Sequence, residues 1–300
     1  MTATVYSEIT IPGLPSASGV EIINETAYVI GDDSAFLHLL DAKTLLLTGN
    51  VRLFETDASG PARIAKADKP DLECMAALVW PDGRPGLLLL GSGSLATRAR
   101  GWFVPTGGAP VPEALDLTPL YALLLPHLPT GVVLNLEAAA TSDTELLLLQ
   151  RTVGRADAAL LFRLPLSATL AFLTGAATAP AVQALRFELP LIAGCAAGFS
   201  GATFVGERLF VTASAEDTAD AVLDGEVLGS FIGVVDLEQE TAEFARLTWA
   251  NGDAYLGKVE GLAVRQTVGA GHWELLLVTD DDAGGSTAVV AQVRAADPNQ

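Results

Sequence analysis

Residues 259–282 read VEGLAVRQTVGAGHWELLLVTDDD, and the pattern in this stretch decides the fold. A Glu-Gly pair opens a short apolar strand, a glycine-rich turn follows at 269–271, and a stronger apolar strand then ends in three aspartates. Glycine supplies the backbone freedom that a tight hairpin turn requires. The stretch therefore predicts a β-hairpin with buried strands and polar residues at one end.

The same sequence pattern occurs at four earlier places in the chain. When the repeats are aligned on Gly19, Glu73, Glu137, Gly201 and Gly261, the intervals are 54, 64, 64 and 60 residues, and the interval through the two chain ends is 58. Such even spacing around a closed circuit is typical of sheets repeated about a common axis. The earlier repeats are SGVEIINETAYVIGDD (18–33), DLECMAALVWPDGRPGLLLLGSGS (71–94), NLEAAATSDTELLLLQR (135–151) and FSGATFVGERLFVTASAED (199–217).

We therefore predict an all-β fold, a five-bladed β-propeller that occupies residues 1–300 as a single domain; six blades are the alternative. Fourth strands are expected at 46–54, 111–117, 182–189 and 242–248. The last repeat has no residues left for a fourth strand after 289–293. Because an unpaired outer strand invites aggregation, we expect the alternating segment 5–11 to close the last blade. Two Pro-initiated apolar segments, 119–125 and 165–173, are predicted to be short helices in connections.

Composition excludes several classes of function. The net charge of −19 argues against nucleic-acid binding, which needs clustered Lys and Arg. No apolar run approaches the length of a membrane span, and the first residues, MTATVYSEITIPGLP, lack the features of a signal peptide. Cys74 and Cys195 are expected to be free thiols in a cytoplasmic protein.

Polar residues are expected to converge at one face of the propeller, where each first strand begins and each second strand ends. First strands begin with Ser18, Asp71, Glu73, Asn135, Glu137, Ser200, Lys258 and Glu260. Second strands end with Asp32, Asp33, Ser92, Ser94, Arg98, Gln150, Arg151, Glu216, Asp217 and Asp280–Asp282. The face is thus rich in carboxylates with a few basic residues.

From this face we select a candidate ligand site: Asp33, Glu73, Arg98, Glu137, Arg151, Glu216, Asp217, Lys258, Glu260, Asp280 and Asp281. Oxygen donors without His or Cys suit Ca²⁺ or Mg²⁺, and the candidate metal ligands are Glu73, Glu137, Glu260 and Asp280. The same carboxylates could instead hold the blades in register. Arg98, Arg151 and Arg155 are expected to face the Asp-rich loops, and this basic half beside an acidic half could hold an anionic ligand such as phosphate, bridged by a metal. The three histidines lie outside this set, which argues against a Ser–His–Asp arrangement or a His-ligated zinc.

The motifs SGVEI, YVIGDD, KPDLECMA, NLEAA, FSGATFVGERLFVTASAEDTADAVLDGEVLGSFIGVVDL, KVEGLAV and LLLVTDDD resemble those of an uncharacterised bacterial propeller family. That family is similar to the phytase-associated "esterase-like" propellers, in which EG motifs open inner strands and DDD motifs end the next. The resemblance spans nearly the whole chain and implies the fold. It marks as family-type positions Glu73, Glu137, Glu216, Asp217, Asp224, Glu260 and Asp280–Asp282. The second and third repeats depart from the EG pair, reading Glu73-Cys74 and Glu137-Ala138.

Two functions remain open from the sequence. The first is a soluble binding protein that recognises a small molecule or a partner protein at the carboxylate-rich face of the central channel. The second is a metal-assisted hydrolase of phosphate or carboxylic esters, in which carboxylates hold the metal and activate water. Binding is the preferred prediction, because no nucleophile–base pair can be assembled from the sequence.

Overall fold

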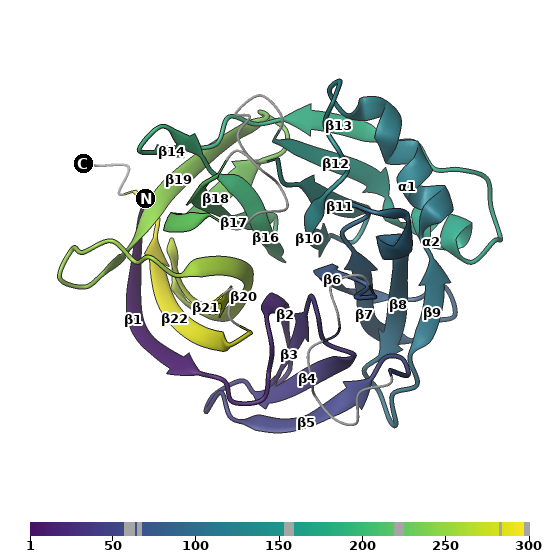
Figure 1. Ribbon diagram of the computed structural model, residues 1–300, viewed down its shortest axis with the longest axis horizontal. Coiled ribbons are helices and arrows are strands. Elements are labelled where there is room, and N and C mark those ends of the chain that lie inside the picture. The colour runs from purple at the N-terminus through teal and green to yellow at the C-terminus, as the bar shows by residue number, and fades with distance from the viewer. Residues whose placement is uncertain (57–63, 65–67, 153–158, 219–224, 282–283, 297–300) are drawn as a thin grey trace.

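The computed structural model describes residues 1–56, 64, 68–152, 159–218, 225–281 and 284–296, and its strands surround a central axis in a propeller-like arrangement (Figure 1). Four-stranded antiparallel sheets follow one another along the chain. The first comprises β2 (Ala17–Ile23), β3 (Thr26–Gly31), β4 (Phe36–Asp41) and β5 (Leu47–Arg52). The second comprises β6 (Leu72–Val79), β7 (Pro85–Gly91), β8 (Arg100–Pro105) and β9 (Glu113–Asp116). The third comprises β10 (Leu136–Thr141), β11 (Glu145–Gln150), β12 (Leu160–Pro165) and β13 (Gln183–Arg186).

The remaining long strands form one eight-stranded sheet with the order β16-β17-β18-β19-β1-β22-β21-β20. Its strands are β16 (Gly198–Val205), β17 (Arg208–Asp217), β18 (Glu226–Asp236), β19 (Thr241–Trp249), β1 (Thr2–Thr10), β22 (Ser286–Arg294), β21 (His272–Asp280) and β20 (Lys258–Gly269). The all-β class is confirmed, and the predicted fourth strands correspond to β5, β9, β13 and β19.

The N-terminal strand β1 closes the molecule. It pairs antiparallel with β22, for example Val5 with Ala291 and Glu8 with Val289, as predicted for the segment 5–11. The sequence did not predict its second partner: β1 also pairs parallel with β19 through Ala3, Thr4 and Val5, which merges two four-stranded units into the eight-stranded sheet. One strand thereby covers two edges that would otherwise be open.

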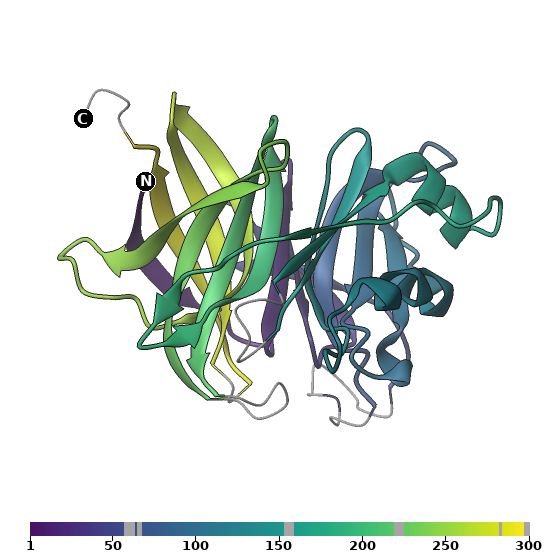
Figure 2. The same cartoon turned by 90° about the horizontal axis from the view of Figure 1, so that it is seen from above.

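The strands nearest the axis contact one another in a closed ring, in the order β2, β6, β10, β16, β20 and back to β2. Figure 2 shows the sheets standing side by side around this ring. Each of these inner strands carries a β-bulge near its start, where one residue has no partner in the neighbouring strand. The bulge residues are Ser18, Glu73, Glu137, Ser200 and Glu260.

These bulges correct the alignment of the repeats. Gly19, Gly201 and Gly261 follow a bulge and therefore match Cys74 and Ala138, not Glu73 and Glu137. Crowding at the axis explains the small residues. A Cβ on Gly261 would lie 2.8 Å from the Gly19 Cα, and a Cβ on Gly201 would lie 3.0 Å from the Gly261 Cα. The position after each bulge must be small because the inner strands approach closely there.

Leucine runs fill the space between neighbouring sheets. In β7, Leu88 and Leu90 belong to the core shared with β10–β12, whereas Leu87 and Leu89 belong to the core shared with the first sheet. Strand β11 likewise divides its four leucines between two cores. Alternate side chains of a strand point to opposite faces, so a continuous apolar run is expected where both faces are covered.

The connections contain short helices and a small hairpin. α1 (Thr118–Leu124) and α2 (Leu166–Leu173) confirm the two predicted helices, and the 3₁₀ turns are η1 (Ala96–Arg98) and η2 (Leu125–His127). β14 (Leu191–Ile192) and β15 (Cys195–Ala196) form a two-stranded hairpin. Both cysteines are free thiols. In the described part of the chain, no helix combines the length and the apolar character that crossing a membrane requires.

Candidate ligand-binding site

The bulges place three of the predicted glutamates around one small cavity on the axis. Glu73, Glu137 and Glu260 line it together with Ser18, and its volume is about 10 Å³. A cavity of this volume holds about one water molecule or one small ion. A bulge re-aims a side chain that would otherwise point between the sheets, which is why bulges are frequent beside binding sites. The predicted convergence of these three glutamates is therefore what the structure contains.

Arg151 ties two of these glutamates to a third carboxylate. It follows β11 and is almost fully buried. Its Nη2 lies 2.8 Å from Glu216 Oε1, and its Nη1 lies 3.3 Å from both Glu137 Oε2 and Glu260 Oε1. The three carboxylates come from β10, β17 and β20. One guanidinium thus connects the third four-stranded sheet with both halves of the eight-stranded sheet.

Lys258, at the start of β20, adds a second cation to this network. Its Nζ lies 3.2 Å from Glu260 Oε1 and 3.4 Å from Glu216 Oε1. Glu137 also accepts a hydrogen bond from Asn135 Nδ2 at 2.6 Å. Because each of these carboxylates has a basic partner, Glu137, Glu216 and Glu260 connect the sheets that surround the axis. We call the end of the axis where the small cavity and these ion pairs lie the channel mouth.

A second network lies beside the first, around Asp71. Arg98 Nη1 lies 2.8 Å from Asp71 Oδ2, and Lys69 Nζ lies 2.9 Å from Asp71 Oδ1. Lys69 also forms an ion pair with Asp32, and Ser92 Oγ donates a hydrogen bond to Asp71. Asp71 has a φ of +56°, a left-handed backbone conformation that Asp tolerates better than most residues. The turn into β6 thus aims this carboxylate at its basic partners.

Glu73 differs from the other glutamates in its partners. Among the residues that the structure describes, none donates it a hydrogen bond or forms an ion pair with it. Asp32 Oδ1 is also buried without a hydrogen-bond partner. Ligating oxygens of Asp32, Asp71 and Glu73 all lie within 4.8 Å of one another. Two carboxylates with unused acceptor capacity therefore meet at this point of the channel mouth.

The electrostatic environment raises the pKa of two glutamates that line the cavity, Glu73 and Glu137, and lowers the pKa of Glu216. Burial raises the pKa of Glu73 well above its usual range, and the nearby Glu137, Asp71 and Asp32 raise it further. Burial raises the pKa of Glu137 to about 7, although Arg151 acts in the opposite direction. Burial by itself would raise the pKa of Glu216, but the nearby Arg151 and Lys258 outweigh this effect and lower the pKa of that carboxyl. The mouth holds more buried carboxylates than its cations can balance.

Of the four predicted metal ligands, Glu73, Glu137 and Glu260 line the small cavity, and Asp280 does not. Glu137 and Glu260 are paired with Arg151, and Asp280 lies at the end of β21, opposite Lys258 and Ser286 in the strand register. Within the described ranges, the group of carboxylates close enough to share an ion is Asp32, Asp71 and Glu73. Glu73 belongs to both sets, whereas Glu137 and Glu260 form ion pairs with Arg151.

The remaining predicted residues that the structure describes neither line the small cavity nor belong to the group Asp32, Asp71 and Glu73. Asp33 is buried next to Asp32, whereas Asp217 and Asp281 are exposed. Asp217 accepts a hydrogen bond from the Cys195 thiol at 3.7 Å, and Asp281 accepts one from the Gly285 amide at 2.7 Å. The candidates Arg155, Asp224 and Asp282 lie outside the described residues.

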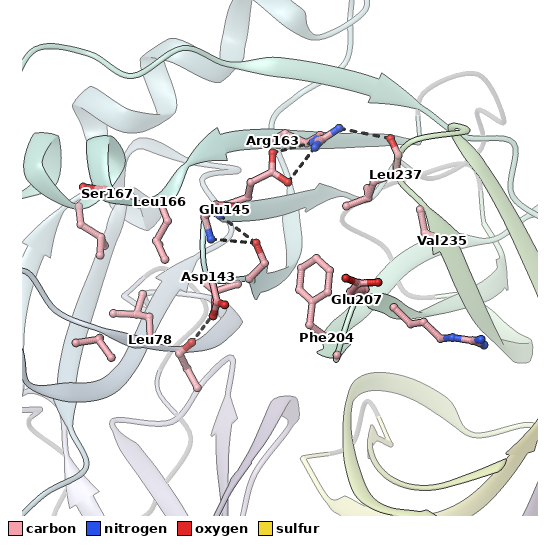
Figure 3. Close-up of a pocket in the computed structure, with 18 of the residues that line it drawn as sticks. Leu78, Asp143, Glu145, Arg163, Leu166, Ser167, Phe204, Glu207, Val235 and Leu237 are labelled. Atoms are coloured by element: carbon pink, nitrogen blue, oxygen red, sulfur yellow. Dashed lines mark hydrogen bonds and ion pairs between the residues drawn. The ribbon is translucent and has the colours of Figure 1, made fainter. Parts of the chain in front are cut away.

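Sequence reasoning missed Lys69 and a cavity on the opposite face. Lys69 precedes Pro70 in the connection to β6, and the available signal was its position two residues before Asp71. The cavity has a volume of about 1870 Å³ and lies at the hairpin turns β6–β7, β10–β11 and β16–β17 (Figure 3). The available signal in the sequence was an apolar residue beside a turn, such as Val79, which is exposed in the structure.

Comparison with known proteins identifies a family. Residues 13–293 match the model of a family of unknown function, DUF6929. No curated protein matches the chain. Among solved structures, the glutaminyl cyclase of Myxococcus xanthus is similar at 11% identity and a TM-score of 0.53, covering 98% of both chains. The Malassezia sympodialis allergen Mala s 1 is similar at 10% identity and a TM-score of 0.50, covering 96% of both. At these identities the likeness extends to the fold alone.

Proposed function

Since the chain belongs to DUF6929, a family of unknown function, we propose a function from its own site: it is a binding protein that takes a small positively charged ligand at the channel mouth. One observation carries the proposal. Glu73 lines the ion-sized cavity without a hydrogen bond or an ion pair from the described residues, and one of its oxygens lies within 4.8 Å of a carboxylate oxygen of Asp32, a residue whose Oδ1 is buried without a hydrogen-bond partner.

Charge supports a cation rather than an anion. Among the described residues, the two networks contain six carboxylates, Asp32, Asp71, Glu73, Glu137, Glu216 and Glu260, and four basic groups, Lys69, Arg98, Arg151 and Lys258. Each basic group already has a carboxylate partner. An anionic ligand would have to displace these partners, whereas a cation would offset the excess negative charge.

The donor atoms indicate the class of cation. Carboxylate oxygens, as at Asp32, Asp71 and Glu73, are the ligands that Ca²⁺ and Mg²⁺ prefer. An ammonium group could donate hydrogen bonds to the same oxygens. A site that holds about one small ion fits either a metal or the charged end of a larger ligand.

Thermal unfolding with added cations tests the proposal. A ligand that binds only the native state raises the melting temperature by mass action. We expect CaCl₂, MgCl₂ or an ammonium salt at millimolar concentration to raise the melting temperature of the wild-type protein, and we expect Glu73→Gln to abolish that rise. Glu25→Gln is the matched control, because Glu25 is exposed in the β2–β3 turn. Melting that no cation changes, or a response that Glu73→Gln leaves intact, would overturn the proposal.

The alternative is a hydrolase that uses the same carboxylates to hold a metal. The observation in its favour is the proximity of ligating oxygens of Asp32, Asp71 and Glu73. Turnover of p-nitrophenyl phosphate or p-nitrophenyl acetate would be measured with and without Ca²⁺ or Mg²⁺. Metal-dependent turnover that Glu73→Gln abolishes and Glu25→Gln preserves would replace the binding function by this one.

We also infer that residues 1–300 form one five-bladed propeller. The support is the recurrence of the bulge at Ser18, Glu73, Glu137, Ser200 and Glu260, and the ring of contacts among the strands that carry it. In this interpretation the eight-stranded sheet is two blades joined by the β1–β19 pairing. An experimental structure with another number of repeats around the axis would contradict it.

A further inference from the structure

The large cavity on the hairpin face is an open groove with an apolar floor. Its walls come from β6–β7, from β10–β12 with α2, and from β16–β19. Leu78, Leu170 and Val235 are buried beneath it, and Phe204 and Val79 are partly or largely exposed to it. Figure 3 shows Phe204 between the Asp143–Glu145 side and the Val235–Leu237 side. The groove therefore offers apolar contact area at its centre.

Hydrogen bonds between elements hold the walls of the groove in place. Arg163 pairs with Glu145 through two bonds of 3.0 and 2.9 Å, and its Nη1 also donates to the Leu237 carbonyl at 3.4 Å. This guanidinium connects the β10–β13 sheet to the turn after β18. On the other side, Thr141 Oγ1 donates to the Ala77 carbonyl of β6. A groove whose shape is fixed before binding loses less conformational entropy when it is filled.

The rim of the groove is acidic. Asp143, Glu207 and Glu238 are exposed there and form no ion pair within the described residues. Of the two arginines that line the groove, Arg163 is neutralised by Glu145, and Arg208 lies over the Trp273 ring at 5.3 Å. A ligand that complements this groove has apolar groups for the floor and positive charge for the rim.

We propose that the groove binds a segment of a partner protein that carries large apolar side chains flanked by Lys or Arg. Its size selects a segment over a small molecule, because typical small-molecule pockets have volumes of about 300–1,000 Å³ and this groove has about 1870 Å³. The groove spans the turns of several sheets, which suits a chain segment several residues long. This interaction is independent of the cation site, which lies at the other end of the channel.

Selection from a phage-displayed library of random dodecapeptides tests the proposal on the full chain. We expect the enriched peptides to combine Leu, Ile, Phe or Trp with Lys or Arg. Their affinities would be measured as synthetic fluorescein-labelled peptides by anisotropy. Val79→Lys removes an exposed apolar contact and adds repulsion to a basic ligand, so we expect it to weaken binding at least tenfold. Asp143→Lys and Glu207→Lys should weaken binding without changing the apolar floor.

Val111→Lys is the matched control, because Val111 is similarly exposed (68% against 59% for Val79) but does not line the groove. Affinity should stay within twofold for Val111→Lys and for Glu73→Gln, and the latter result separates this groove from the cation site. Three results would overturn the proposal: a selection that enriches no peptide, enriched peptides that bind Val79→Lys as tightly as the wild type, or binding of a small cationic dye in the groove without any peptide binding.

Discussion

Arg151 balances much of the negative charge at the channel mouth. Its guanidinium contacts Glu137, Glu216 and Glu260, and all four side chains are at least nine-tenths buried. Removing one partner of a buried ion pair is costly because the remaining charge stays desolvated and unpaired. Replacement by a hydrophobic residue of similar size isolates this electrostatic effect from the packing of the side chain.

We expect Arg151→Met to lower the free energy of unfolding by about 3–5 kcal/mol, measured by urea denaturation. Arg84→Met is the control. Arg84 forms ion pairs with Asp82 and Glu113, but its side chain is 40% exposed, so its loss should cost about 1 kcal/mol or less. Equal effects of the two substitutions would show that the network around Arg151 is not a buried electrostatic unit.

Glu137 makes stability depend on pH. Its pKa rises from 4.5 in the unfolded chain to about 7 in the fold, so the folded state holds more protons between these values. Stability from this group is therefore present below about pH 4.5 and is lost as the pH rises towards 7. We expect Glu137→Gln to become more stable relative to wild type by up to about 3 kcal/mol between pH 5 and 8. Urea denaturation at each pH measures this difference, and a difference that does not grow with pH would contradict the assignment.

The sequence anticipates which glutamates meet but not how they are paired. Glu73, Glu137 and Glu260 could be grouped because each opens an inner strand, and strands around one axis begin at one face. Gly19, Gly201 and Gly261 were aligned one residue away from their true equivalents in the other repeats. A bulge residue and its neighbour cannot be distinguished without the backbone hydrogen bonds. The choice of Glu137 over Glu73 by Arg151 depends on side-chain torsions, which no sequence pattern records.

At the scale of the element, the inner strands combine a bulge with a small residue. The bulge turns Glu260 towards the cavity, and Gly261 then lets β20 approach β2. A Cβ at Gly261 would lie 3.0 Å from the Val20 amide nitrogen as well as 2.8 Å from the Gly19 Cα, and backbone atoms cannot move aside cheaply. The spacing of the inner strands is thus set by the absence of a side chain.

We expect Gly261→Ala to lower the free energy of unfolding by about 1–3 kcal/mol, the usual cost of overpacking a well-filled core. Gly269→Ala is the matched control on the same strand, because a Cβ there meets no atom within 4 Å. Thermal or urea unfolding of both variants checks the difference. A neutral Gly261→Ala would mean that β2 and β20 can separate freely.

Strand order could be predicted because local signals determine it: turn residues mark each hairpin, and leucine runs mark strands covered on both faces. The antiparallel pairing of β1 with β22 was also predictable, since segment 5–11 has the alternating pattern of a strand and an outer strand needs a partner. The parallel pairing of β1 with β19 was not predictable, because the sequence of Ala3, Thr4 and Val5 does not indicate a second partner strand. The groove escaped prediction for a similar reason, since it forms only when turns of separate sheets come together.

At the scale of the whole molecule, a net charge of −19 opposes folding by self-repulsion. Salt screens such repulsion, and the Debye length falls from about 30 Å at 0.01 M to about 10 Å at 0.1 M ionic strength. Screening acts on the whole surface, whereas a bound cation acts only at the channel mouth. The size of the cation can separate the two effects, because a cavity of about 10 Å³ excludes bulky ions.

We therefore expect tetramethylammonium chloride to raise the melting temperature gradually as ionic strength increases, with the same response in wild type and Glu73→Gln. CaCl₂ at equal ionic strength should raise it further in wild type, and this additional rise should disappear in Glu73→Gln. Differential scanning calorimetry with both salts measures the two contributions. A melting temperature that falls in tetramethylammonium chloride would show that buried ion pairs, and not surface repulsion, dominate the electrostatics of the fold. Identical curves for the two salts would remove the evidence for a cation at Glu73 while leaving the screening effect intact.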